Sequence, residues 1–238
     1  MKKKEKIIGI LGGMGPEATI DLYNKIIKLT AANKDQEHLR IIIDNNPKIP
    51  DRSMAILKGQ TSLLNALQKT ALNLEKAGAD FIIMPCNTAH YYISSLKSIV
   101  NVPVLNMIEE TAKEINSIKP KIKKVGLLAT DGTIKTKLYF QALEKYSTKV
   151  ILPEEEEQKL VMLSIYNLKA GKLTKENKKS IVKVVHNLIL QGAEAIIAGC
   201  TEIPIILEKE KLSVPMIDPT LILTKASILY AGGNIKKY

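Results

Sequence analysis

Cysteine is scarce in this sequence, with only Cys86 and Cys200 among 238 residues. The chain does not begin with the ordered basic, apolar and small-residue segments of an export signal, so we expect a cytoplasmic protein. A structural disulfide is rare in that compartment, and two thiols are too few for a structural zinc site. A lone cysteine is usually a small buried hydrophobe, so any chemical function for these two depends on where they stand in the chain.

The sequence is also poor in aromatic side chains and has no long apolar run. It has no Trp and two Phe, and its net charge of +11 comes from 35 Lys and Arg against 24 Asp and Glu. The lysines are scattered along the expected helices instead of forming one stripe, and few groups could stack on bases, so we expect no nucleic-acid partner. Every apolar run is shorter than the roughly 20 residues of a membrane-spanning helix, so we expect no membrane partner either.

Short apolar segments alternate with amphipathic segments along the whole chain. This pattern predicts parallel sheets with helices on both faces, an α/β fold that occurs twice. We place the two domains at residues 1–110 plus 219–238, with a terminal helix from Pro219 returning to the first half, and at residues 111–218. The expected strands cover residues 7–11, 39–44, 81–86, 102–105, 125–130, 149–152, 195–200 and 214–217.

The two halves repeat one arrangement around the cysteines. Gly78-Ala-Asp precedes the apolar run that ends at Cys86, and Gly192-Ala-Glu precedes the run that ends at Cys200, 114 positions later. Each thiol would lie where a parallel strand ends and a helix begins, which is the edge at which α/β proteins bind ligands. We expect the helix dipole and backbone donors to lower both thiol pKa values. Thr88 could cap the helix after Cys86, and His90 could hold a thiolate or simply be packed.

A glycine turn after the first strand supports a different interpretation. Gly13-x-Gly15-x-x-Ala18 fits a dinucleotide-binding turn, and Asp44 at the end of the next strand could bind a ribose. Glycines at a helix start also let other small anions approach backbone amides. No similar glycine pattern recurs at Asp131-Gly-Thr133 in the second half, which weakens the hypothesis of an NAD(P)-dependent oxidoreductase.

Two thiols in facing halves suggest proton transfer at a carbon atom. One thiolate would remove a proton from one face of the carbon, and the opposite thiol would return a proton to the other face, which inverts the centre. A proton next to a carboxylate is hard to remove unless the carboxylate is neutralised by fixed donors. Arg52, in the loop after the second strand, is suited to bind a carboxylate with two hydrogen bonds.

These residues resemble the aspartate/glutamate racemase family, which works without pyridoxal phosphate, and within it aspartate racemase most. The resemblance covers nearly the whole chain. It rests on five segments, namely Gly9-Ile-Leu-Gly-Gly-Met-Gly-Pro-Glu-Ala-Thr19, Pro50-Asp-Arg52, Pro85-Cys-Asn-Thr-Ala-His90, Ile165-Tyr-x-x-x-Lys169-x-Gly171 and Gly199-Cys-Thr-Glu202.

The resemblance implies two pseudo-symmetric flavodoxin-like (Rossmann-like) domains with an active site between them, a homodimer, and no cofactor or metal. It implies that Cys86 and Cys200 are the acid/base pair and that Arg52 and Lys169 bind substrate carboxylates. The further implied substrate-binding residues are Met14, Asn87, Thr88, Thr130 and Thr201. The expected reaction is racemisation of an acidic amino acid, with aspartate as the first candidate substrate and glutamate as the second. A protein that binds dicarboxylates without turnover is the non-catalytic alternative.

Overall fold

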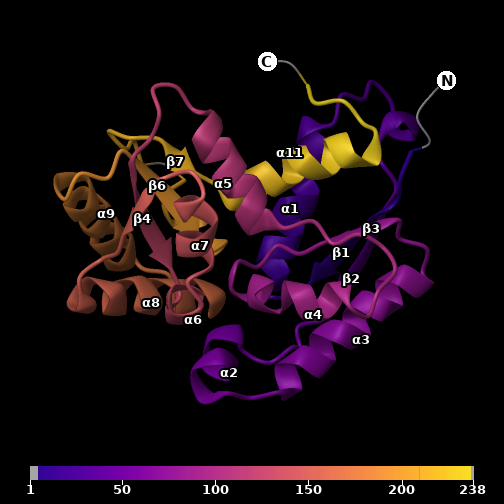
Figure 1. Ribbon diagram of the computed structural model, residues 1–238, viewed down its shortest axis with the longest axis horizontal. Helices are drawn as coiled ribbons and strands as arrows, with labels where there is room; N and C mark the ends of the chain where they lie inside the picture. Colours follow the sequence, from indigo (N-terminus) through magenta and orange to yellow (C-terminus); the bar gives the residue numbers. More distant parts are fainter. Residues whose placement is uncertain (1–4, 209, 237–238) are drawn as a thin grey trace. The chain divides into compact units, whose positions relative to one another are not determined.

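The computed structural model describes residues 5–208 and 210–236 (Figure 1). The chain forms two compact units. The first unit contains the chain up to Met107 and again from Thr220, and the second unit is Ile108–Pro219. Within the described ranges, no helix is both long enough and apolar enough to cross a membrane.

The first unit is built on a three-stranded parallel sheet. Its strands are β1 (Ile8–Gly12), β2 (Ile41–Asn45) and β3 (Phe81–Ile83), in the order β2-β1-β3. The prediction of a fourth strand at residues 102–105 is wrong, because only Val104 forms a bridge, to Ile82. The N–H of Ile82 donates to the carbonyl of Pro103, and the N–H of Leu105 donates to the carbonyl of Ile82, which makes this single bridge.

Helices cover both faces of this sheet, as alternation along buried strands requires. Ile8 and Ile10 pack with side chains of α1 (Pro16–Leu29) and α11 (Pro219–Ala231) on one face. Leu11 packs on the opposite face with side chains of α3 (Ser62–Lys76) and α4 (Ile93–Lys97). The remaining elements of this unit are η1 (Asp35–Glu37), α2 (Arg52–Lys58) and η2 (Thr88–Tyr92).

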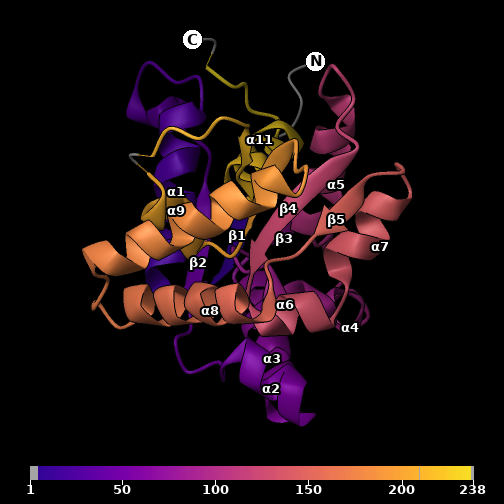
Figure 2. The same ribbon diagram turned by 90° about the vertical axis from the view of Figure 1, so that its left-hand side faces the viewer.

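The second unit repeats this plan with four parallel strands. They are β4 (Lys124–Ala129), β5 (Lys149–Ile151), β6 (Ala195–Gly199) and β7 (Met216–Ile217), in the order β5-β4-β6-β7. One face is covered by α8 (Glu155–Lys169) and α9 (Lys175–Leu190), and α5 (Met107–Ser117) and α7 (Leu138–Glu144) lie on the other side (Figure 2). Two short helices, α6 (Asp131–Lys135) and α10 (Glu202–Ile206), begin at the carboxyl edge of the sheet.

Both sheets therefore place the first strand of their unit in the middle, between the second and the third. This is the strand order of flavodoxin-like folds. In both units a cysteine follows the third strand, β3 or β6, so the repeat seen in the sequence is also a repeat in topology. The predicted α/β fold with two parallel sheets is confirmed.

Candidate active site

Cys86 lies in a buried turn at the carboxyl edge of the first sheet. Two residues separate it from the end of β3, its N–H donates to the carbonyl of Met84 (2.9 Å), and its side chain is 6% exposed. The chain then enters η2, where Asn87 and Thr88 are also buried. The prediction that Thr88 caps a helix is wrong, because Asn87 stands at the cap position, without a capping bond from its side chain, and Thr88 is already inside the turn.

His90 supports this turn through the backbone. Its Nδ1 lies 2.8 Å from the carbonyl of Cys86, and its Nε2 accepts a hydrogen bond from the N–H of Met107 (3.1 Å). A ring nitrogen that accepts carries no proton, so Nδ1–H is the donor and the ring is neutral. Complete burial lowers the pKa of His90 to about 4, in agreement with this neutral form. Of the two roles left open for His90, the structure favours packing: the ring bonds the carbonyl of Cys86.

Arg52, the first residue of α2, is fixed by backbone carbonyls. Its guanidinium donates to Ile49 (3.3 Å), Pro50 (3.1 Å) and Met14 (3.2 Å). The structure thus brings together two predicted site residues, Arg52 and Met14. Among the described residues, no carboxylate lies within ion-pair distance of Arg52. Because α2 contacts η2, this charge is anchored in an element that packs against the segment after Cys86.

The glycine turn serves packing inside the unit. Gly13 has φ +90°, and a side chain there would meet the backbone of Asn46 at 2.3 Å, so only glycine fits. Its N–H donates to Thr19 Oγ1 (2.9 Å), so this amide is already used within the protein. Asp44 accepts a bond from Asn73 of α3. The N–H of Gly13 and the carboxylate of Asp44 are thus both bonded within the protein, so neither contact indicates a dinucleotide site.

Cys200 follows β6 directly and bonds to a carboxylate. Its Sγ donates to Glu202 Oε2 (2.8 Å), and Thr201 Oγ1 donates to the same oxygen (3.1 Å). Cys200, Thr201 and Glu202 are all at most 6% exposed. Glu202 belongs to the GCTE segment, but sequence reasoning assigned it no function. The signal that could have found it is its position, two residues after the cysteine at a helix start.

The expectation of a lowered thiol pKa is wrong for Cys200. Burial and the neighbouring Glu202 carboxylate raise the pKa of Cys200 well above its ordinary value, and Lys169 offsets only part of this. A thiolate here would lose hydration and stand beside a negative charge, and both effects favour the protonated thiol. The helix dipole cannot reverse this, because α10 has only five residues.

Lys169 and Thr130 complete the site of the second unit. Lys169 is the last residue of α8, its side chain is 25% exposed, and its Nζ lies 3.9 Å from Glu202 Oε1. Thr130 follows β4 and caps α6 by accepting a bond from the N–H of Thr133 (3.3 Å). Because Ala129 pairs with Gly199, Thr130 and Cys200 follow neighbouring strand ends. The facing of Cys86 and Cys200 stays a prediction.

Comparison with known proteins identifies the family. The model of the family described as Asp/Glu/Hydantoin racemase matches residues 11–226, which is most of the chain. The chain belongs to the Asp/Glu/Hydantoin racemase family. It is an isomerase with the amino-acid racemase activity of this family.

Two relatives of this racemase are similar over nearly their whole length. The broad specificity amino-acid racemase RacX of Bacillus subtilis (strain 168) is 31% identical over 228 residues, which are 93% of this chain and 96% of RacX. The solved structure of Picrophilus torridus aspartate racemase has a TM-score of 0.87 and 35% identity, and it covers 98% of this chain and 96% of its own.

A more distant structure shows that the fold is shared more widely. Glutamate racemase from Francisella tularensis subsp. tularensis SCHU S4, solved in complex with D-glutamate, has a TM-score of 0.74 with 20% identity. It covers 96% of this chain and 82% of its own. At this identity the similarity concerns the fold alone. The two-sheet architecture of the racemase described above is therefore the architecture of its relatives.

Proposed function

We propose that this racemase inverts the α-carbon of an acidic amino acid, aspartate first and glutamate second, without a cofactor. The observation that carries the choice of substrate is Arg52. Three backbone carbonyls hold its guanidinium, and no described carboxylate pairs with it. A fixed cation without a counter-charge favours an anionic ligand, and the planar guanidinium matches a carboxylate. The similarity to an aspartate racemase at 35% identity supports the same substrate class.

The proposed chemistry uses the two thiols as a two-base pair. One cysteine, as thiolate, takes the α-proton, and the C–H electron pair stays on the carbon as a carbanion. The other cysteine, as thiol, gives its proton to the opposite face of that carbon. The two cysteines end with exchanged protonation states, and no electrons are gained or lost. Arg52 and Lys169 would neutralise the carboxylates beside which the carbanion forms.

The contacts of Cys200 support an assignment of roles within this pair. The thiol of Cys200 donates a hydrogen bond to Glu202, and burial raises the pKa of this thiol. Cys200 therefore rests as the thiol and is the proton donor of the first turnover. The base of the resting enzyme is then Cys86. Asn87, Thr88 and Thr201 are buried next to the two thiols, and Met14 and Thr130 follow the strands β1 and β4. Lys169 lies 3.9 Å from Glu202, the hydrogen-bond partner of Cys200. We propose all six as substrate-binding residues.

The test follows optical activity and solvent hydrogen together. Pure protein with reductant, without added pyridoxal phosphate, should bring the signal of L-aspartate to zero and exchange its α-proton for deuterium from D₂O. Cys86→Ser and Cys200→Ser should each lower racemisation by about 10³-fold, the scale of a lost acid or base. Full racemisation by both variants would refute the two-thiol mechanism. Rapid turnover of neutral amino acids with none of aspartate would refute the choice of substrate.

The assembly and location of the enzyme are also proposals. The resemblance to the aspartate/glutamate racemase family implies a homodimer, and the sequence suggests a cytoplasmic protein. We expect sedimentation equilibrium to give twice the mass of 26.3 kDa. A single species at the monomer mass, over the concentrations used for activity, would refute the dimer.

A further inference from the structure

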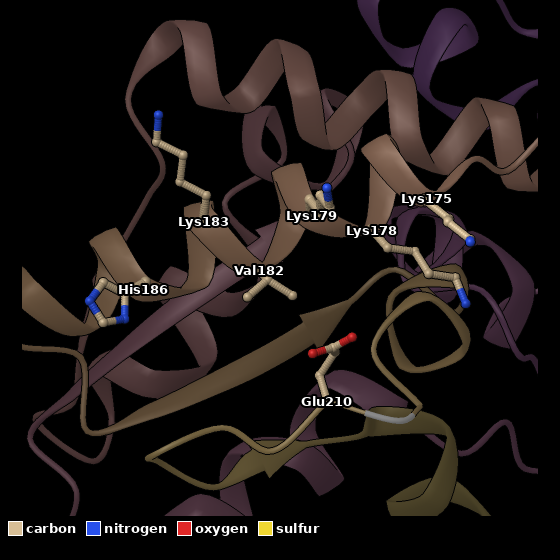
Figure 3. Close-up of a pocket in the computed structure, with 7 residues that line it drawn as sticks. All are labelled: Lys175, Lys178, Lys179, Val182, Lys183, His186 and Glu210. Carbon is tan, nitrogen blue, oxygen red and sulfur yellow. The ribbon is translucent and has the colours of Figure 1, made fainter.

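The exposed face of α9 carries a pocket that is rich in lysine. Lys175, Lys178, Lys179 and Lys183 line it together with Val182, His186 and Glu210, and its volume is about 570 Å³ (Figure 3). We call these seven residues the lysine pocket. For this helix the prediction of scattered lysines is wrong, because four of them gather on one face. None of these residues belongs to the racemase site described above.

The helix period explains why these side chains share a face. At about 100° per residue, positions 175, 178, 179, 182, 183 and 186 fall within roughly 140° of the helix circumference. The opposite face carries Ile181, Val184 and Leu188, which are buried against the sheet of the second unit. The sheet therefore fixes the rotation of α9 and presents the lysines outward. Glu210, which lies outside α9, lines the same pocket and faces this helix (Figure 3).

The pocket has a strong excess of positive charge. Among the residues that the structure describes, none of the four lysine amino groups has a carboxylate within ion-pair distance. Glu210 is the acidic residue of the lining, and its side chain extends toward the side of α9 that carries Lys178 and Val182 (Figure 3). One carboxylate cannot balance four ammonium groups that repel each other. An anion with several charges would relieve this repulsion.

The size and the chemistry of the lining indicate the class of ligand. From Lys175 to His186 the row spans about 16 Å at 1.5 Å per residue, too long for a single phosphate to use. The volume is in the range of small-molecule sites. Ammonium groups bind phosphate as point charges, and His186 is the one ring of the described lining, which has no Phe, Tyr or Trp on which a nucleic-acid base could stack. Val182 and the methylene stems of the lysines provide an apolar floor.

We propose that the lysine pocket binds a small molecule that carries two or more linked phosphates. The shared chemistry is the phosphate chain, which a nucleoside triphosphate and an inorganic polyphosphate both have. The proposal is independent of the racemase reaction and requires no change in its rate.

Calorimetric titration with tripolyphosphate tests it at about 0.05 M salt, where charge screening is weak. The triple variant Lys175→Gln, Lys178→Gln, Lys179→Gln should bind at least about tenfold more weakly, since it loses three of the four ammonium groups. Glu210→Gln should bind about threefold more tightly, since it removes the opposing charge. The matched control is Lys58→Gln, Lys69→Gln, Lys76→Gln, which removes the same charge from exposed helical positions in the first unit. It should change the affinity less than about twofold.

The remaining arms identify the source of the phosphates. Tighter binding of ATP than of tripolyphosphate would assign the pocket to a nucleotide, and equal binding would assign it to an inorganic chain. An equal loss in the pocket variant and in the control variant would overturn the proposal, because net charge alone would then explain binding. Binding of a short poly-glutamate as tight as that of tripolyphosphate would also overturn it, in favour of an acidic protein segment.

Discussion

The two cysteines occupy equivalent places in two similar sheets, but the ionisable side chains that follow them act on different atoms. In the first unit, neutral His90 binds the carbonyl of Cys86 and fixes the course of the backbone. In the second unit, Glu202 accepts a hydrogen bond from the thiol of Cys200 and favours the protonated form of that thiol. Strand order therefore positions both thiols, whereas the side chain two or four residues later decides how each environment affects its cysteine.

The cations of the two units differ in the same way. Arg52 is held by uncharged carbonyls, so its charge stays available to a ligand. Lys169 lies 3.9 Å from Glu202 and lowers the pKa of Cys200, against the larger effects of burial and Glu202. One cation is thus suited mainly to binding, and the other also tunes a thiol. This contrast can be tested one side chain at a time.

Among the charged and ionisable side chains around the two thiols, the largest effect is expected for Arg52→Lys. Lysine keeps the charge but cannot reach three carbonyls and still offer two parallel donors to a carboxylate. We expect kcat/KM for L-aspartate to fall by about 10²–10³-fold, or roughly 3–4 kcal/mol of transition-state stabilisation. Arg40→Lys is the matched control, because Arg40 is the other arginine of the chain and is exposed. A loss no larger than that of the control would contradict the binding role.

The next largest effect is expected for His90→Gln. It should change the pH dependence of the free energy of unfolding and leave the protonation of the Cys86 thiol unaffected. Its pKa is about 4 in the folded protein and 6.5 in an ordinary environment. The unfolded chain therefore gains a proton as the pH falls through 6.5, whereas the folded chain does not until about 4. The contribution of the neutral ring is complete above pH 6.5 and is lost by up to about 3 kcal/mol as the pH falls to 4.

The measurement is the free energy of unfolding in urea at pH 7.5 and pH 5. The wild-type protein should lose about 2 kcal/mol more than His90→Gln between these values, because the variant has no ring to protonate. His186→Gln, at an exposed position of α9, should keep the full wild-type loss. An identical pH dependence of the wild-type protein and His90→Gln would show that His90 is not the group responsible.

Glu202→Gln should have a smaller effect, directed at one thiol. Glutamine still accepts a hydrogen bond but removes the negative charge that raises the pKa of Cys200. The pH midpoint for alkylation of Cys200 by iodoacetamide, followed by mass spectrometry of the digest, should move down. Racemisation should slow by about tenfold, because a smaller fraction of Cys200 would then carry the proton that it must donate. Cys86 in the same digest is the internal control, and an equal shift at both cysteines would refute a local effect.

The course of the chain was largely predictable from the sequence. The apolar runs at Ile8–Gly12 and Ala195–Gly199 are buried strands, and the Gly-Ala-acid repeat marked the two equivalent turns. The weak point was Val102–Leu105, where only Val104 forms a bridge, whereas the similar segment Val214–Ile217 contains the paired strand β7. Hydrophobic period and turn residues decide topology, and these are properties of the sequence.

The electrostatics of the site were not predictable in the same way. A strand–cysteine–helix pattern indicates a helix dipole at the thiol, but α10 is short and a buried carboxylate dominates. Whether Glu202 turns toward Cys200 depends on its rotamer and on packing, which residue spacing does not fix. For the same reason the sequence indicated that His90 lies near Cys86, but it did not indicate that the ring bonds the carbonyl of Cys86.

Lys169→Gln should produce the smallest effect, a shift in the alkylation midpoint of Cys200. The direction of this shift is informative. Lys169 lowers the pKa of Cys200, so its removal should move the alkylation midpoint of Cys200 up, opposite to Glu202→Gln. The shift should be smaller, because the amino group is 3.9 Å from Glu202 and a quarter of the side chain is exposed to screening water. Lys159→Gln, on the exposed side of the same helix, should leave the midpoint unchanged. Midpoints that move in the same direction for Lys169→Gln and Glu202→Gln would mean that neither charge sets the state of the thiol, and burial alone would then distinguish Cys200.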